Sequence, residues 1–270
     1  MLKKQRIDLL LVEKGFFSSR ERAKAAIMAG SVLVNNQKVD KAGTEVPILS
    51  EIRVLGNNNP YVSRGGLKLA KAIESFALDL HNKVVMDVGA STGGFTHCAL
   101  EAGAAKVYAV DVGYGQLAWS LRQNPQVVNL ERTNIRYLEP ESLEELPEFV
   151  TIDVSFISLT KVLEKIYQLT QTPAEVVALI KPQFEAGRDK VGKRGVVRDP
   201  SIHETVIQQV LSFAVDTGFR VERLDFSPIR GPEGNIEYLV YLRKGSESGV
   251  AEEITVSGVV AAAHNDLASS

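Results

Sequence analysis

The sequence predicts two domains, a small α+β domain at the N-terminus and a larger α/β domain built on a mostly parallel sheet. The 270 residues exceed the length of one ordinary domain. A polar, turn-forming GNNNP segment at residues 56–60 separates two regions of different pattern. After residue 65, short apolar runs alternate with helical segments, which is typical of a parallel sheet covered by helices on both faces.

The first region, residues 6–54, has the pattern of a compact α+β unit. RIDLLLVEKG has helical apolar spacing, and Ser18-Ser19 offers an N-cap for a second helix that ends at Gly30. SVLVNNQKV predicts a hairpin that turns at two asparagines, and EIRVL predicts a further strand. We therefore predict an N-terminal domain over residues 1–59 and a linker over residues 60–64.

The second region predicts seven strands, preceded by an amphipathic helix in GLKLAKAIESFAL. The strands are KVVMDV, KVYAVDV, VVNLE, FVTIDVS, EVVALIKP, FRVERLDFSPI and EYLVYLRK. No long helix separates the last two, which indicates that the final strand is antiparallel. The domain would span residues 65–245, and the Ser/Gly/Ala-rich residues 246–270 read as a tail with one short helix around VSGVVAAAHNDL.

Composition and charge limit the function. The single cysteine, Cys98, excludes an intrachain disulfide and a cysteine-based metal site, and we expect no metal. The longest apolar stretches fall short of the roughly 20 residues of a membrane helix, so we expect a cytoplasmic protein without membrane contact. Residues 1–66 carry eleven basic and six acidic side chains, a net +5 on a mildly acidic body, which favours a polyanionic partner for this end.

A glycine-rich turn after the first strand of the larger domain predicts a cofactor site. Asp87–Phe95 reads DVGASTGGF, and Asp111 ends the second strand, where an acidic side chain binds ribose hydroxyls. The glycines at 89, 93 and 94 do not form the G-x-G-x-x-G of a dinucleotide site. We therefore predict a Rossmann-like domain that binds S-adenosylmethionine (SAM), with Asp87 near its ammonium, rather than NAD.

Four charged residues adjoin apolar runs where such a fold places chemistry: Lys68, Asp153, Lys181 and Glu237. Each one alone is more often a solvated strand end, but the set of two lysines and two carboxylates is informative. Methylation of a ribose hydroxyl needs a lysine that accepts the proton or a cation that stabilises the alkoxide. Carboxylates would orient those lysines, so we predict that these four residues are catalytic.

The motifs SRGGLKL, DVGASTGGFT, DVGYGQL, TIDVSFISL, LIKPQFEAGR, GVVRDP and GNIEYLVYL together resemble the TlyA family, whose members are often called hemolysin A. Its catalytic half is similar to the FtsJ (RrmJ) ribose 2′-O-methyltransferases. The resemblance implies a K-D-K-E tetrad carried by the four residues above, with Lys181 as general base assisted by Asp153, and methylation of cytidine in ribosomal RNA. It also implies SAM contacts from Gly89, Ala90, Ser91, Gly93, Gly94, Phe95, Asp111, Asn134 and Asp153.

The N-terminal motifs RIDLLLVEKG, SRERAKAAIMAG and VLVNNQKVDKAG resemble the S4 RNA-binding domain. Basic side chains there can contact phosphates, and the S4 family recognises folded RNA by shape. The predicted RNA-binding residues are Arg6, Ser19, Arg20, Arg22, Lys24, Lys38, Lys41 and Arg64. The expected partner is ribosomal RNA or a ribosomal subunit, and we expect the protein itself to be a monomer.

Three other functions compete with the methyltransferase. The first is an S4-type RNA-binding protein with an inactive methyltransferase body, which the complete tetrad disfavours. The second is a membrane-lysing hemolysin, for which we find no spanning or strongly amphipathic cationic segment. The third is an NAD-dependent oxidoreductase, which the glycine spacing disfavours.

Overall fold

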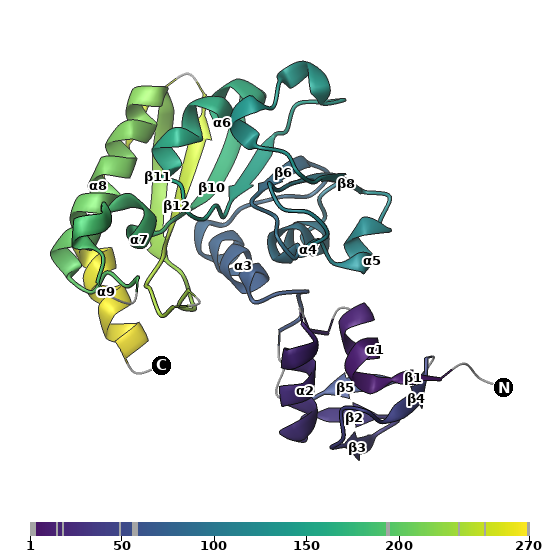
Figure 1. The fold of residues 1–270 in the computed structure, drawn as a ribbon. Helices are drawn as coiled ribbons and strands as arrows, with labels where there is room; N and C mark the ends of the chain where they lie inside the picture. The colour runs from purple at the N-terminus through teal and green to yellow at the C-terminus, as the bar shows by residue number, and fades with distance from the viewer. Residues whose placement is uncertain are drawn as a thin grey trace.

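The computed structural model describes residues 4–14, 16–17, 19–48, 50–55, 59–192, 195–231, 233–245 and 247–268. Ser18 of the predicted N-cap pair and residues 56–58 of the predicted linker turn lie outside them. Figure 1 shows a small N-terminal domain below a larger domain that carries the long central sheet. The chain enters the larger domain through α3 (Gly65–Phe76).

The N-terminal domain packs two helices, α1 (Ile7–Glu13) and α2 (Arg20–Met28), against short strands. One three-stranded sheet has the order β3-β2-β5 and a separate pair joins β1 to β4. The strands are β1 (Lys4–Arg6), β2 (Val32–Val34), β3 (Gln37–Val39), β4 (Glu45–Pro47) and β5 (Ile52–Val54). Both predicted helices and the hairpin are confirmed, whereas the β1–β4 pair was not predicted because three-residue strands show no clear alternation.

Local signals in the sequence explain these elements. The hydroxyl oxygen of Ser19 accepts the backbone N–H of Arg22 at 3.3 Å and so caps α2. Asn35 and Asn36 form the turn between β2 and β3 with φ values of 49° and 62°. Two successive positive φ angles define the type I′ turn, which matches the twist of the strands that it joins.

The larger domain contains an eight-stranded sheet with the order β13-β11-β12-β10-β9-β6-β7-β8. All seven predicted strands are present, and β12 runs antiparallel to both β10 and β11, as the sequence predicted for the final strand. The strands are β6 (Val84–Val88), β7 (Lys106–Val110), β8 (Val127–Leu130), β9 (Phe149–Ile152), β10 (Ala174–Ile180), β11 (Phe219–Phe226), β12 (Tyr238–Lys244) and β13 (Gly249–Val250).

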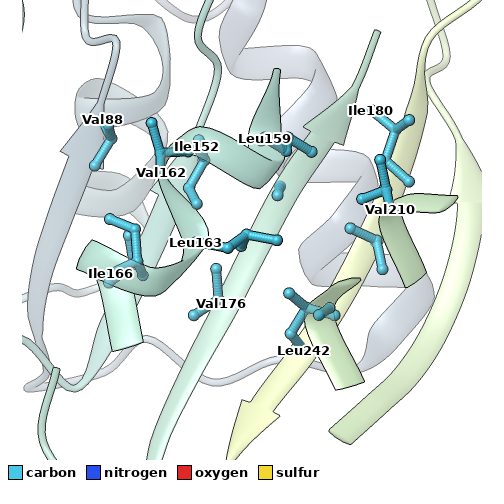
Figure 2. Packing of buried hydrophobic residues seen from close by; sticks show 14 of the residues in the cluster. Val88, Ile152, Leu159, Val162, Leu163, Ile166, Val176, Ile180, Val210 and Leu242 are labelled. Carbon is cyan, nitrogen blue, oxygen red and sulfur yellow. The ribbon is translucent and has the colours of Figure 1, made fainter. Parts of the chain in front are cut away.

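Helices cover both faces of this sheet. On one face, α3 and α4 (Gly94–Glu101) pack Leu69, Phe95 and Cys98 against the strands. On the other face lie α6 (Leu163–Leu169), α8 (Pro200–Thr217) and α9 (Val256–Ala268). Figure 2 shows Leu163 and Val210 of this second face packed over the strand residues Val176 and Leu242. Two short helices, α5 (Trp119–Arg122) and α7 (Pro182–Glu185), follow β7 and β10.

The segment that the sequence analysis treated as a tail is part of the fold. Its first residues form β13, which pairs in parallel with β11. The predicted short helix is α9, and its Val260, Ala263 and Leu267 are buried in the core. Figure 1 shows α9 beside α8. The small residues of this helix give little hydrophobic periodicity, although they allow close packing.

Among the described residues, no helix is long and apolar enough to cross a membrane.

Candidate active site

The carboxyl ends of β6, β7, β8 and β9 surround a cavity of about 550 Å³. Parallel strands bring the loops that follow them to one edge of the sheet, which is where α/β folds bind ligands. The residues lining the cavity include Gly89, Ser91, Asp111, Asn134 and Asp153, all of which the sequence predicted as cofactor contacts. Five predicted contacts from four different strand ends therefore meet in one cavity.

The glycine turn after β6 brings β6 and β9 close together. Gly89 has a φ of +87°, and a Cβ at this position would lie 2.5 Å from the carbonyl oxygen of Asp153. Only glycine combines this conformation with this spacing. The backbone therefore lines the cavity directly, as a close-fitting ligand requires.

Asp111 is held across the glycine turn. One carboxylate oxygen accepts the N–H of Ser91 at 2.7 Å, and the other accepts the N–H of Gly113 at 2.7 Å. The side chain is thus fixed at the end of β7, where acidic residues of this fold meet ribose hydroxyls. Asn134 lines the same cavity, and its side-chain oxygen accepts the N–H of Arg136 at 3.2 Å.

A second cavity of about 600 Å³ lies on the other side of the glycine turn. It shares Gly89, Ser91 and Asp153 with the first cavity and adds Lys68. The N-terminal domain supplies further lining residues, Arg22 among them. A small molecule in the first cavity and a larger substrate in the second would therefore meet next to Asp153.

The four predicted catalytic residues form one continuous chain of ion pairs. The Nζ of Lys181 lies 2.5 Å from Oδ1 of Asp153, and the Nζ of Lys68 lies 3.9 Å from Oδ2 of the same carboxylate. The Nζ of Lys68 also lies 2.5 Å from Oε2 of Glu237. Charges of opposite sign alternate along the chain Lys181–Asp153–Lys68–Glu237, so the set as a whole is neutral.

This chain of charges is largely removed from water. Lys68 and Lys181 are each 7% exposed and Glu237 is 1% exposed. Buried charges are costly unless they are paired, and here each one has an opposite partner. Lys181 also donates to the hydroxyl oxygen of Ser155 at 3.1 Å. Asp153 lines both cavities and Lys68 lines the second, whereas Lys181 and Glu237 lie behind them as their ion-pair partners.

Comparison with known families agrees with this site. The model of the FtsJ-like methyltransferases matches residues 61–244, and the S4 domain model matches residues 5–49. The chain belongs to the FtsJ-like methyltransferase family. The FtsJ-like match contains all four members of the ion-pair chain and the glycine turn that lines both cavities. The S4 match covers most of the N-terminal domain.

Curated relatives carry both kinds of name that the sequence resemblance brought up. The methyltransferase is 41% identical to the 16S/23S rRNA (cytidine-2′-O)-methyltransferase TlyA of Mycobacterium tuberculosis, over 93% of this chain and 94% of that one. It is 42% identical to Hemolysin A of Brachyspira hyodysenteriae, over 87% of this chain and 98% of that one. A solved structure from Streptococcus thermophilus, described as a candidate hemolysin, is 46% identical, with a TM-score of 0.79 and coverage of 100% and 98%.

The remaining predicted cofactor residues of the methyltransferase lie around the glycine turn but outside the first cavity. Ala90, Gly94 and Phe95 line the second cavity instead. A Cβ on Gly93 would lie 2.3 Å from Leu121, so this glycine lets α5 pack on the turn.

Asp87 lines neither of these two cavities and is 1% exposed. One of its carboxylate oxygens accepts the N–H of Thr96 at 2.9 Å and the hydroxyl of Thr96 at 2.7 Å. Burial raises the pKa of Asp87 to about 7, and the nearby charge of Asp153 acts in the same direction. These contacts fix the start of α4 behind the glycine turn, so the geometry favours support of the turn over contact with a ligand ammonium.

Apart from Lys24, which is half-buried on α2, the predicted RNA-binding arginines and lysines, with Arg64 of the linker among them, fall into two groups. Arg6 and Arg20 both pair with the buried Asp8, at 2.9 Å each, and the contact with Arg6 holds the pKa of this carboxyl well below its usual range. Lys38 and Lys41 are exposed, and Arg22 and Arg64 line the second cavity. The first group therefore stabilises the domain, while the exposed Lys38 and Lys41 lie where a polyanion can reach them.

The sequence analysis did not single out Ser155 and Phe156, which lie two and three residues after Asp153. Phe156 is 92% exposed and has a φ of +64°, and its ring lies 5.1 Å from that of Phe184. An exposed aromatic ring at the cavity rim offers a stacking surface for a base. Their position at the end of the predicted strand FVTIDVS and just beyond it, close to a predicted catalytic aspartate, was the available signal.

Within the described ranges, no group of three or more histidine, cysteine, aspartate or glutamate side chains is arranged to hold a metal ion.

Proposed function

We propose that the chain transfers a methyl group from SAM to a ribose 2′-hydroxyl of ribosomal RNA, with cytidine as the target nucleotide. The observation that carries this proposal is the buried chain Lys181–Asp153–Lys68–Glu237, whose Asp153 lines both cavities and whose Lys68 lines the second. The TlyA relatives named as rRNA (cytidine-2′-O)-methyltransferases support the choice of RNA and of base. An rRNA-modifying enzyme would work in the cytoplasm, and we propose that it does so as a monomer.

The residues that line the first cavity suit the parts of SAM. We propose that Asp111 binds the ribose hydroxyls of SAM and that Asn134 lies beside its adenine. The backbone at Gly89 and Ser91 would approach the methionine part, because no side chain intervenes at Gly89. When bound, SAM supplies an electrophilic sulfonium methyl, so the chain itself has to orient and deprotonate the acceptor.

We assign proton acceptance to Lys181. In its neutral amine form, the Nζ of Lys181 takes the proton of the 2′-hydroxyl as that oxygen gains the methyl group and the bond between methyl and sulfur breaks. Asp153, whose Oδ1 lies 2.5 Å from this nitrogen, stabilises the resulting ammonium. Ser155 accepts a further hydrogen bond at 3.1 Å and fixes the direction of the lysine side chain.

Lys68 and Glu237 would orient the ribose from the second cavity. Lys68 lines this cavity, and its contact with Glu237 determines where its ammonium points. A methyl transfer in line with the leaving sulfur depends strongly on alignment, and a displacement of about 1 Å can slow such a step by about a hundredfold. The buried, fully paired geometry of these two residues suits that demand.

The N-terminal domain would hold the RNA. Its exposed lysines, Lys38 and Lys41, would contact phosphates, which gives affinity without base specificity. Arg22 and Arg64 line the second cavity next to Lys68, so RNA bound on this domain would reach the catalytic residues. Shape recognition by the N-terminal domain and chemistry at the tetrad would together select the target nucleotide.

The test is transfer of labelled methyl groups. The purified chain is incubated with methyl-labelled SAM and, separately, with small ribosomal subunits, large ribosomal subunits and deproteinised rRNA. We expect label in RNA at a linkage that resists alkaline cleavage, because a 2′-O-methyl group blocks attack of that oxygen on the phosphate. Label on a base would contradict the ribose assignment. SAM binding without transfer to any of the three would favour an RNA-binding protein with an inactive body.

A further inference from the structure

Asn235, in the segment that precedes β12, binds the backbone of a loop that is distant in the sequence. Its side-chain nitrogen donates to the carbonyl of Gly195 at 2.8 Å, and its side-chain oxygen accepts the N–H of Val197 at 3.0 Å. Asn235 is 2% exposed and Val197 is 3% exposed. The side-chain amide of Asn235 thus donates to one backbone group and accepts from another, as the backbone of a neighbouring strand would. Asn235 lies two residues before Glu237.

His203 holds the same loop from the other side. This residue lies on α8 and is 0% exposed. Its Nε2 is 3.0 Å from the carbonyl oxygen of Val197, and its Nδ1 is 2.7 Å from the hydroxyl of Tyr238. A carbonyl only accepts, so Nε2 carries the hydrogen and Nδ1 accepts from Tyr238. Nε2 of His264 approaches the same Nδ1 at 3.3 Å.

Together with the backbone of residues 235–238, these hydrogen bonds close a ring that includes Glu237. Asn235 and Tyr238, which flank the Ile236-Glu237 segment, are both tied to Val197, the first directly and the second through His203. Within the described residues, the ring contains no solvent-exposed side chain. Val197 therefore holds the Asn235 side chain on one side of Glu237 and, through His203, the Tyr238 hydroxyl on the other.

The same segment closes the wall of the second cavity. The N–H of Gly231 donates to the carbonyl of Asn235 at 2.9 Å, and Gly231 lines the cavity beside Lys68. A Cβ on Gly231 would lie 2.6 Å from Oε1 of Glu237, so the backbone of this wall packs directly on the catalytic carboxylate. A shift of Asn235 would move both the wall and the carboxylate.

We propose that Asn235 and His203 are positioning residues that lock Glu237, and through it Lys68, in place for ribose methylation. This inference rests on the proposed function and adds two residues that touch neither the ribose nor the cofactor. Loss of the Asn235 amide leaves the buried N–H of Val197 without its partner, and the segment relaxes to find another one. Lys68 then follows Glu237, because their charged groups are 2.5 Å apart.

The experiment compares single-turnover methyl transfer by Asn235→Ala and the wild type, with SAM and rRNA saturating and well below each melting temperature. We expect the rate constant to fall at least about tenfold, since alignment is lost, while the Kd for SAM changes less than about twofold. Hydrogen exchange of the Val197 amide, which needs no activity, should become at least about tenfold faster. An unchanged rate constant together with a freely exchanging Val197 amide would overturn the proposal.

Two further pairs of variants separate positioning from general stability. Thr170→Ala removes a buried hydrogen bond to the carbonyl of Ile166 at the opposite end of the sheet, and it should leave the rate constant unchanged. His203→Gln keeps a donor near Nε2 and should retain most of the rate, whereas His203→Ala should lose it. Equal rates for these two histidine variants would contradict the role of His203, even if Asn235→Ala does not fold.

Activity of the wild type distinguishes failure of the proposed function from failure of the positioning role of Asn235 and His203. If the wild-type chain methylates no rRNA substrate, the proposed function fails, and the Val197 exchange still tests the lock. If the wild type is active and Asn235→Ala is equally active, only the inference about positioning fails.

Discussion

The ammonium of Lys68 lies 2.5 Å from a carboxylate oxygen of Glu237, although 169 residues separate them in the sequence. Lys68 enters from α3, before the first strand of the large sheet, and Glu237 directly precedes β12. Both side chains are almost fully buried. This contact links two segments that are distant in the sequence of the methyltransferase domain, at the site that we propose to be catalytic.

Removing one partner of this pair should destabilise the fold strongly. We expect Lys68→Met to lower the free energy of unfolding by about 3–5 kcal/mol, because Glu237 stays buried without its partner. The double variant Lys68→Met/Glu237→Leu should lose less than the sum of the single changes. Urea unfolding of the four proteins gives the coupling, and strictly additive losses would show that the pair is not coupled.

Much of this site was predictable because its residues sit at strand ends. Asp111 and Asp153 each follow a β-rich run, and the carboxyl ends of parallel strands meet at one edge, so their proximity follows from the fold. Lys68 and Glu237 are harder, because neither follows a parallel strand. They were singled out as charges beside apolar runs, the family resemblance then implied the tetrad, and the structure brings the two into contact.

Other features depend on tertiary contacts that leave no local signal. Asn235 looks like a turn residue in GNIEY, and only the fold brings Gly195 and Val197 against its amide. Asp87 has the sequence pattern of a ligand-binding residue, but one of its carboxylate oxygens accepts both the N–H and the hydroxyl of Thr96. The apolar residues of α9 are mostly small, so its burial against α8 was not evident from periodicity.

Gly89→Ala should abolish tight SAM binding. The new methyl group would lie 2.5 Å from the carbonyl oxygen of Asp153, at a φ of +87° that disfavours side chains. Backbone strain of this kind costs about 1–3 kcal/mol, so we expect the Kd for SAM to rise about tenfold or more in calorimetric titration. Gly218→Ala is the control, because this glycine also has a positive φ but caps α8 away from the rim. A SAM affinity equal to that of the wild type would contradict the proposed cofactor cavity.

Lys38→Ala and Lys24→Ala should weaken RNA binding without changing SAM binding. Each lost phosphate contact should reduce the slope of log K against log salt by about 1. Filter binding of rRNA over a series of salt concentrations measures this slope. Lys165→Ala, on α6 of the catalytic domain, serves as the matched loss of one positive charge. Equal slopes for all three variants would place the RNA elsewhere on the molecule.

Stability should depend on pH through His203. Burial lowers the pKa of His203 from its ordinary value of 6.5, and the charge of His264 acts in the same direction. The unfolded chain therefore takes up this proton at a higher pH than the folded chain does, so the stabilising effect is complete above pH 6.5 and declines below it. We expect the Tm of the wild type to fall relative to that of His203→Gln as the pH drops from 8 to 5. If Tm changed with pH by the same amount in both proteins, the pKa of His203 would not be lowered by folding.

The most direct test of the central claim is single-turnover methyl transfer by Lys181→Ala, with saturating SAM and the rRNA substrate that the wild type methylates. Loss of a proton acceptor should slow the transfer by about 10²–10⁴-fold, while the Kd for SAM stays the same. The control is Lys106→Ala, which removes a lysine paired with Glu144 and Glu145 at the start of β7, at the opposite end of the sheet. If Lys181→Ala and Lys106→Ala transfer methyl groups at the same rate as the wild type, the assignment of Lys181 as the catalytic base is wrong.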